Sequence, residues 1–159
     1  MNRPPLRTLG RSCWALVPLV LASCGSGTGP GGAARSADAS LKAADTAVQT
    51  AMTGYAAEVD RCTAAPSPVV CLETADRTLG NQIHTYANLL AVGRGFSAPR
   101  GELAVARNAA QTLANSLEIL GDAQPTQANY DQVRNTFDVV AAITGLQRAV
   151  SKVQHSLGA

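Results

Sequence analysis

Residues 102–121 read ELAVARNAAQTLANSLEILG, and this stretch decides the fold. Its apolar residues return at steps of three and four, at Leu103, Ala106, Ala110, Leu113, Leu117 and Leu120. Such steps place side chains on one face of an α-helix. Pro99 suits the first turn of this helix and Gly121 its carboxyl-terminal cap, so we expect a helix between them.

The same spacing recurs in three other segments. The first carries Leu41, Val48, Met52, Tyr55, Val59 and Cys62, with a polar residue at position 45 of the stripe, and it ends before Pro66. The second carries Leu72, Ala75, Leu79, Ile83, Tyr86 and Leu90 and stops at Gly93. The last follows Pro125 and carries Tyr130, Val133, Phe137, Val140, Ile143, Leu146, Val150, Val153 and Leu157. We expect four helices, of which the last is the longest.

The helices imply an all-α fold. Apolar residues make up 46% of the chain and aromatic residues only 4%, which favours closely packed helices. Short connections predict an antiparallel up-down-up-down four-helix bundle over residues 36–159, with Ser36 or Ser40 capping the first helix and Asp38 and Asp45 near its positive end. The alternative is a pair of helical hairpins that associates with a partner chain.

The amino-terminal residues have the layout of a signal peptide. Residues 1–13 are basic without an acidic group, and residues 14–22 form an apolar run. A membrane-spanning helix needs roughly 20 apolar residues, so this run is too short to serve as one. The glycine-rich residues 24–35 that follow predict a flexible tether.

The apolar run closes with Leu21, Ala22, Ser23 and Cys24. This tetrapeptide resembles the lipobox of bacterial lipoproteins. The resemblance implies that signal peptidase II removes residues 1–23 and that Cys24 carries a diacylglycerol and fatty acyl chains such as palmitate. It places the protein in the bacterial envelope, anchored on the outer side of the cytoplasmic membrane or at the outer membrane. The alternative is a signal peptide of the other class with an incidental cysteine.

The charge balance argues against nucleic acid as a partner. The formal net charge is +2, but Arg3, Arg7 and Arg11 lie in the leader. Without them the chain is close to neutral, and no basic run with interleaved aromatic residues supplies a phosphate-binding stripe.

Cys62 and Cys71 lie in the expected domain, with eight residues between them. An exported protein meets an oxidising compartment, so we expect a disulfide that joins the first two helices. A redox or metal-binding pair is the alternative.

Other chemistry has little support. Met52, His84 and His155 are isolated, and no haem-attachment or Glu-x-x-His motif accompanies them, so we expect no cofactor and no metal. The acidic residues are scattered, and the cluster of Asp60, Arg61, Glu73, Asp76 and Arg77 is typical of a solvated ion-pair patch, so we expect no catalytic residues and no enzyme.

Glycines occur both within the expected helices and in one connecting loop. Gly54, Gly80 and Gly145 lie within expected helices, where they indicate either plain tolerance or a close helix crossing. Residues 93–96, Gly-Arg-Gly-Phe, predict an exposed loop available to a partner. The resulting hypothesis is a membrane-anchored, non-enzymatic helical module that binds an envelope protein or a cell-wall polymer. The alternative is a carrier of a small apolar ligand, a lipid or haem, between the helices.

Overall fold

The computed structural model describes residues 30–93, 95–122 and 126–158, and all the regular elements in these ranges are helices. The helices are α1 (Pro30–Thr63), α2 (Pro68–Val92), α3 (Arg100–Gly121), α4 (Gln127–Thr136) and α5 (Val139–Ser156). The all-α prediction is confirmed. Within these ranges, no helix combines the length and the apolar character needed to cross a membrane.

The first helix begins earlier than expected. α1 starts at Pro30, so residues 30–35 of the predicted tether are helical. The Ser36 and Ser40 hydroxyls donate to the carbonyls of Ala33 and Ser36, at 2.9 and 3.0 Å. Both serines therefore lie inside the helix, and the prediction that one of them caps it was wrong.

The last expected helix is two helices. Asp138 interrupts it, because its Oδ1 accepts a hydrogen bond from the Ala141 amide at 2.9 Å and so caps α5, while Phe137 is extended. The break also changes which side chains face inward. Val139 is 3% exposed and Val140 is 71% exposed, whereas continuous periodicity would have buried Val140.

The helices pack with their apolar stripes inward. Leu113, Leu117 and Leu120 of α3 are fully buried against α2 and α5. At Gly80 a Cβ atom would lie 3.3 Å from the Leu117 Cβ, whereas Gly54 and Gly145 have open space around them. Of these three glycines, only Gly80 marks a close helix crossing.

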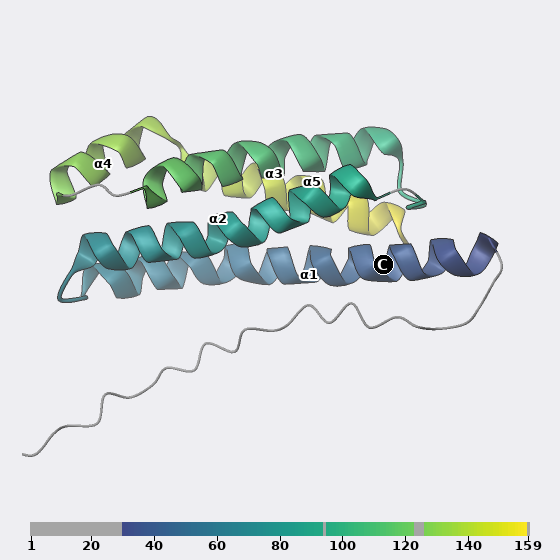
Figure 1. The fold of residues 1–159 in the computed structure, drawn as a ribbon, viewed down its shortest axis with the longest axis horizontal. Coiled ribbons are helices and arrows are strands. Elements are labelled where there is room, and N and C mark those ends of the chain that lie inside the picture. Colours follow the sequence, from purple (N-terminus) through teal and green to yellow (C-terminus); the bar gives the residue numbers. More distant parts are fainter. Residues whose placement is uncertain (1–29, 94, 123–125, 159) are drawn as a thin grey trace, which may run out of the picture.

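Contacts at the two ends define the directions of the helices (Figure 1). At the end where α1 begins, Asp38 accepts hydrogen bonds from Ser97, and Lys42 donates to the Gly158 carbonyl at 3.4 Å. At the other end, a disulfide joins α1 to α2, and Arg77 of α2 donates to the Gly121 carbonyl of α3. α2 is therefore antiparallel to α1 and to α3, and α5 is antiparallel to both α1 and α3.

Candidate functional site

Two buried aspartates hold the α1–α2 hairpin. Asp45 of α1 accepts a hydrogen bond from the Tyr86 hydroxyl of α2 at 2.7 Å. Asp76 of α2 accepts one from the Tyr55 hydroxyl of α1. Both carboxylates are fully buried. The pairs are reciprocal, since each helix contributes one aspartate and, ten residues later, one tyrosine.

The second pair extends to α4. The Tyr130 hydroxyl donates to Asp76 Oδ2 at 2.6 Å and accepts from Arg134 Nη1 at 2.7 Å. The Arg134 guanidinium also lies 5.8 Å from the centre of the Tyr130 ring. Asp76 thus collects donors from two other helices, and all three tyrosines of the chain bond to a buried carboxylate.

Burial controls the ionisation of these groups. It raises the pKa of Asp45 to about 6, against which the Tyr86 hydrogen bond acts only in part. It also raises the pKa of Asp76, although Tyr130 and Tyr55 both oppose the shift. Asp45 is the less satisfied of the two, because its Oδ2 has no hydrogen-bond partner among the described residues.

This network was not predicted from the sequence. The prediction of a solvated patch was wrong for Asp76, which lies in the core, and Arg61 pairs with Glu58 rather than with Asp60. Position 45 had stood out as polar within an apolar stripe, and Asp-(x)9-Tyr occurs in both helices of the hairpin. That repeated spacing was the available signal.

The structure joins Cys62 and Cys71 with an S–S distance of 2.03 Å, which is the pairing that the sequence analysis expected. Glu58 lies close enough to both sulfurs to suggest a three-ligand metal group. Both sulfurs are committed to the disulfide, however, and the Glu58 carboxylate accepts hydrogen bonds from Arg61. The arrangement therefore serves as a covalent link between α1 and α2.

Replacing both Cys62 and Cys71 with serine is expected to lower the free energy of unfolding by about 3 kcal/mol, because the bond closes a loop of about 10 residues in the unfolded chain. Urea unfolding with and without a thiol reductant measures the effect. The reductant should destabilise the native protein and leave the double variant unchanged. Equal sensitivity of both proteins would contradict the assignment.

A groove lies between the end of α2, the loop that follows it and the first turns of α3. We call it the α2–α3 groove; it has a volume of about 620 Å³. Its lining residues are Leu90, Gly93, Gly95, Phe96, Arg100, Leu103, Ala104 and Arg107. Cavities of roughly 300–1,000 Å³ hold small molecules in other proteins. The volume is therefore sufficient for a ligand.

The loop between the two helices shapes this groove. Phe96 is half-buried with its ring against Gly93, where an added Cβ would lie 1.8 Å from the ring carbon Cε2. Gly95 has a φ of +100°, which favours glycine. Phe96 is therefore folded back onto the core, and the expectation of a simply exposed loop was wrong for this residue. Arg94 lies outside the described residues.

Charge is unevenly distributed along the molecule. We divide it at the level of Met52 into a half that contains the start of α1 (30–51, 81–110 and 147–158) and a half that contains the disulfide (52–80 and 111–146). Among the described residues, the first half has the basic residues Arg35, Lys42, Arg100, Arg107, Arg148 and Lys152 and the acidic residues Asp38, Asp45 and Glu102. The second has the basic residues Arg61, Arg77 and Arg134 and the acidic residues Glu58, Asp60, Glu73, Asp76, Glu118, Asp122, Asp131 and Asp138.

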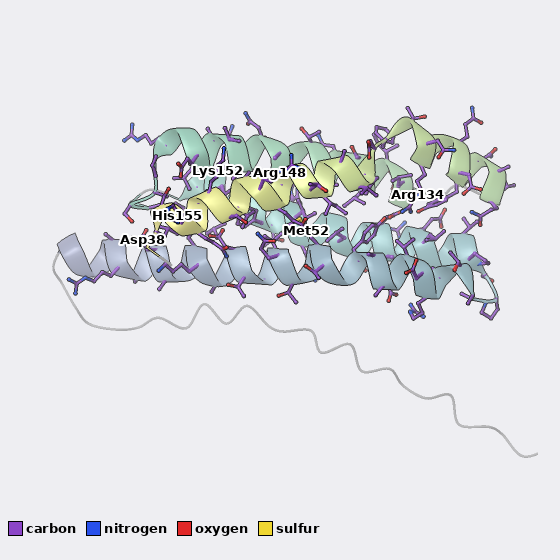
Figure 2. All side chains as sticks on the ribbon, turned by 180° about the vertical axis from the view of Figure 1, so that it is seen from behind. Asp38, Met52, Arg134, Arg148, Lys152 and His155 are labelled. Carbon is purple, nitrogen blue, oxygen red and sulfur yellow. A yellow bond between two sulfur atoms is a disulfide. The ribbon has the colours of Figure 1, made fainter. Side chains whose placement is uncertain are left out.

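We call these the basic half and the acidic half. Figure 2 shows Arg148, Lys152 and His155 on the side of Met52 toward the start of α1, and Arg134 on the opposite side. Sequence alone did not reveal this separation, because it becomes visible only when the four long helices are placed side by side.

The remaining predicted residues are scattered. Met52 is buried in the core, and His84 and His155 are exposed on different helices, so the three do not converge. Leu21, Ala22, Ser23 and Cys24 lie outside the described residues.

Comparison with known proteins gave no match: no family model, no curated protein and no solved structure resembles the chain at a significant level.

Proposed function

We propose that this chain is the precursor of a lipid-anchored protein of the bacterial envelope, and that its helical domain is a non-enzymatic module that binds another envelope component, a protein or a cell-wall polymer. The lipobox-like residues Leu21, Ala22, Ser23 and Cys24 support the anchor. The structural observation that carries the proposal is the direction of α1.

α1 runs from one end of the molecule to the other. Its 34 residues correspond to about 50 Å of helix. Cys24 precedes its first residue, Pro30, by only six positions, whereas the disulfide lies at its far end. A lipid on Cys24 would therefore hold the basic half at the membrane and present the acidic half roughly 50 Å away.

The acidic half offers a surface for a partner. A shallow depression of about 360 Å³ lies beside the disulfide, and Val70 on its edge is 62% exposed. The excess of acidic residues in this half as a whole favours a partner with a basic surface, because opposite charges accelerate association and select the orientation of binding.

We further infer that α1, α2, α3 and α5 act as an antiparallel up-down-up-down bundle to which α4 is an addition. Each of these four helices packs against two of the others, and the directions alternate along the chain. Such a bundle would give the anchored protein the rigidity needed to hold its far end away from the bilayer.

The anchor is tested by the mass of the mature protein. We expect cleavage before Cys24 with a diacylglycerol on that residue, and we expect Cys24→Ala to leave the protein unprocessed by signal peptidase II. Intact mass measurement of protein extracted from membranes tests both expectations. An amino terminus at Cys24 without lipid would refute the anchor.

Partner binding is tested by photo-crosslinking in intact cells. A crosslinking amino acid at Val70 in the acidic half is compared with one at Val105 in the basic half, because the two valines are 62% and 59% exposed. We expect a specific crosslinked product at Val70 that is absent at Val105 and lost in Cys24→Ala. Identical products at both positions would refute presentation of the acidic half.

The second candidate is a carrier of an apolar ligand, and the α2–α3 groove is the observation that favours it. A lipid suits this groove better than haem, because its lining contains no histidine, methionine, cysteine or tyrosine to bind iron.

A further inference from the structure

We propose that the α2–α3 groove binds the headgroup of an anionic phospholipid in the membrane that anchors the protein. This inference rests on the proposed function, since it uses the anchor to bring the groove to the bilayer.

The groove combines apolar and cationic walls. Leu90, Phe96 and Leu103 supply its apolar surface. Arg100 and Arg107 are seven residues apart on α3, which places them two turns apart on the same side of the helix. A ligand that fills the groove would therefore meet both hydrocarbon and two guanidinium groups, which is the chemistry that suits an amphiphile with an anionic head.

The two arginines are available for an anion. Among the described residues, no acidic side chain forms an ion pair with either of them, and both are exposed. The nearest acid along the helix, Glu102, accepts a hydrogen bond from Ser156 of α5 instead. A single guanidinium group can donate two parallel hydrogen bonds to phosphate oxygens, so each of the two arginines can bind an anionic headgroup.

The start of α3 adds to the positive potential. α3 has 22 residues, and Pro99 before it forms no side-chain cap. The helix dipole places partial positive charge at this uncapped end, close to Arg100, and Glu102 in the first turn offsets only part of it. Helix and side chains therefore favour an anion at the same point.

The position of the groove in the molecule favours a membrane lipid as the source of that anion. Ser97, in the loop beside the groove, bonds to Asp38 near the start of α1, so the groove lies at the end of the molecule that a lipid on Cys24 would hold at the bilayer. The other basic residues of this half would reinforce the attraction, since Lys and Arg side chains are drawn to an anionic membrane surface.

The experiment uses the acylated, processed full chain in vesicles. Cys62 and Cys71 are bonded and Cys24 would carry lipid, so Asn108→Cys supplies a single reactive thiol for a fluorophore beside the groove. Gln132→Cys on α4 carries the same fluorophore in the acidic half as the control. Vesicles contain phosphatidylcholine alone or with phosphatidylglycerol, and in each case a spin-labelled lipid quenches fluorophores near the headgroups.

We expect phosphatidylglycerol to increase quenching at position 108 and not at position 132. Arg100→Gln with Arg107→Gln should weaken the response to phosphatidylglycerol roughly tenfold or more, since the variant loses the charge-assisted hydrogen bonds to the headgroup as well as two positive charges. The matched control is Arg148→Gln with Lys152→Gln, which removes the same charge from the basic half outside the groove and should have a smaller effect.

Several results would overturn the proposal. Equal loss in the two double variants would mean that general electrostatic attraction, and not the groove, recognises the surface. Quenching that is equal in both lipid compositions would exclude an anionic headgroup. Displacement by inorganic phosphate at constant ionic strength would identify free phosphate as the ligand, and displacement by hexaglutamate an acidic peptide. Failure of the anchor is distinguishable, because a protein without lipid on Cys24 would not remain with vesicles of phosphatidylcholine alone.

Discussion

Asp76→Ala is expected to lower the free energy of unfolding by about 3–5 kcal/mol. The substitution removes the acceptor of both the Tyr55 and the Tyr130 hydroxyls. Each buried donor left without a partner costs roughly 1–3 kcal/mol, and the small alanine leaves a cavity in addition. Chemical unfolding followed by circular dichroism measures the change.

Two variants control this prediction. Asp76→Asn keeps an oxygen acceptor in the same place and should restore a substantial part of the lost stability. Asp60→Ala removes an exposed carboxylate from the same half of the molecule and should change stability by less than about 0.5 kcal/mol. If Asp76→Ala were as mild as Asp60→Ala, the buried network would not contribute to stability.

The second large effect is on the pH dependence of stability. The pKa of Asp45 is about 6 in the folded protein and ordinarily 3.8, so the folded state binds more protons between these values. The stabilisation contributed by Asp45 is therefore fully present below pH 3.8 and is lost as the pH rises through about 6. We expect the free energy of unfolding to be about 1.4 kcal/mol higher at pH 5 than at pH 7 from Asp45 alone.

Other carboxylates determine the window for this measurement. The pKa of Asp76 is also raised, so it contributes in the same direction. Hydrogen bonds from Ser97 lower the pKa of Asp38, and one from Arg61 lowers that of Glu58, so their contributions are lost only as the solution becomes more acidic. Urea unfolding of Asp45→Asn should show a flatter dependence between pH 5 and 7, while the exposed Asp131→Asn should retain the native slope. A native slope in Asp45→Asn would assign the dependence to another group.

Much of the helical structure follows from the apolar period. The stripes predicted for α2 and α3 are the buried faces of those helices, with only Leu103 partly exposed. The division of α4 from α5 was missed because the apolar steps continue across Asp138, and its capping hydrogen bond depends on a local backbone change that periodicity does not detect.

The candidate sites were harder to predict for a different reason. Burial of Asp45 and Asp76 depends on tyrosines 41 and 21 residues away, which reach them only after the hairpin has formed. The α2–α3 groove depends on the Phe96 ring lying against Gly93. Neither arrangement has a sequence motif beyond the spacing of its own residues.

The reciprocal Asp–Tyr pairs have a consequence for how this hairpin can change in length. The aspartate and the tyrosine are ten residues apart on each of the two antiparallel helices. A slip of one helical turn, about 5.4 Å, would therefore separate both pairs at once and leave four buried polar groups without hydrogen-bond partners. A residue inserted between Asp45 and Tyr55 would need a matching insertion between Asp76 and Tyr86. Length variation should therefore be tolerated outside these intervals, in the first residues of α1 before Asp38, where a few residues more or less would only move the domain relative to the proposed attachment point at Cys24.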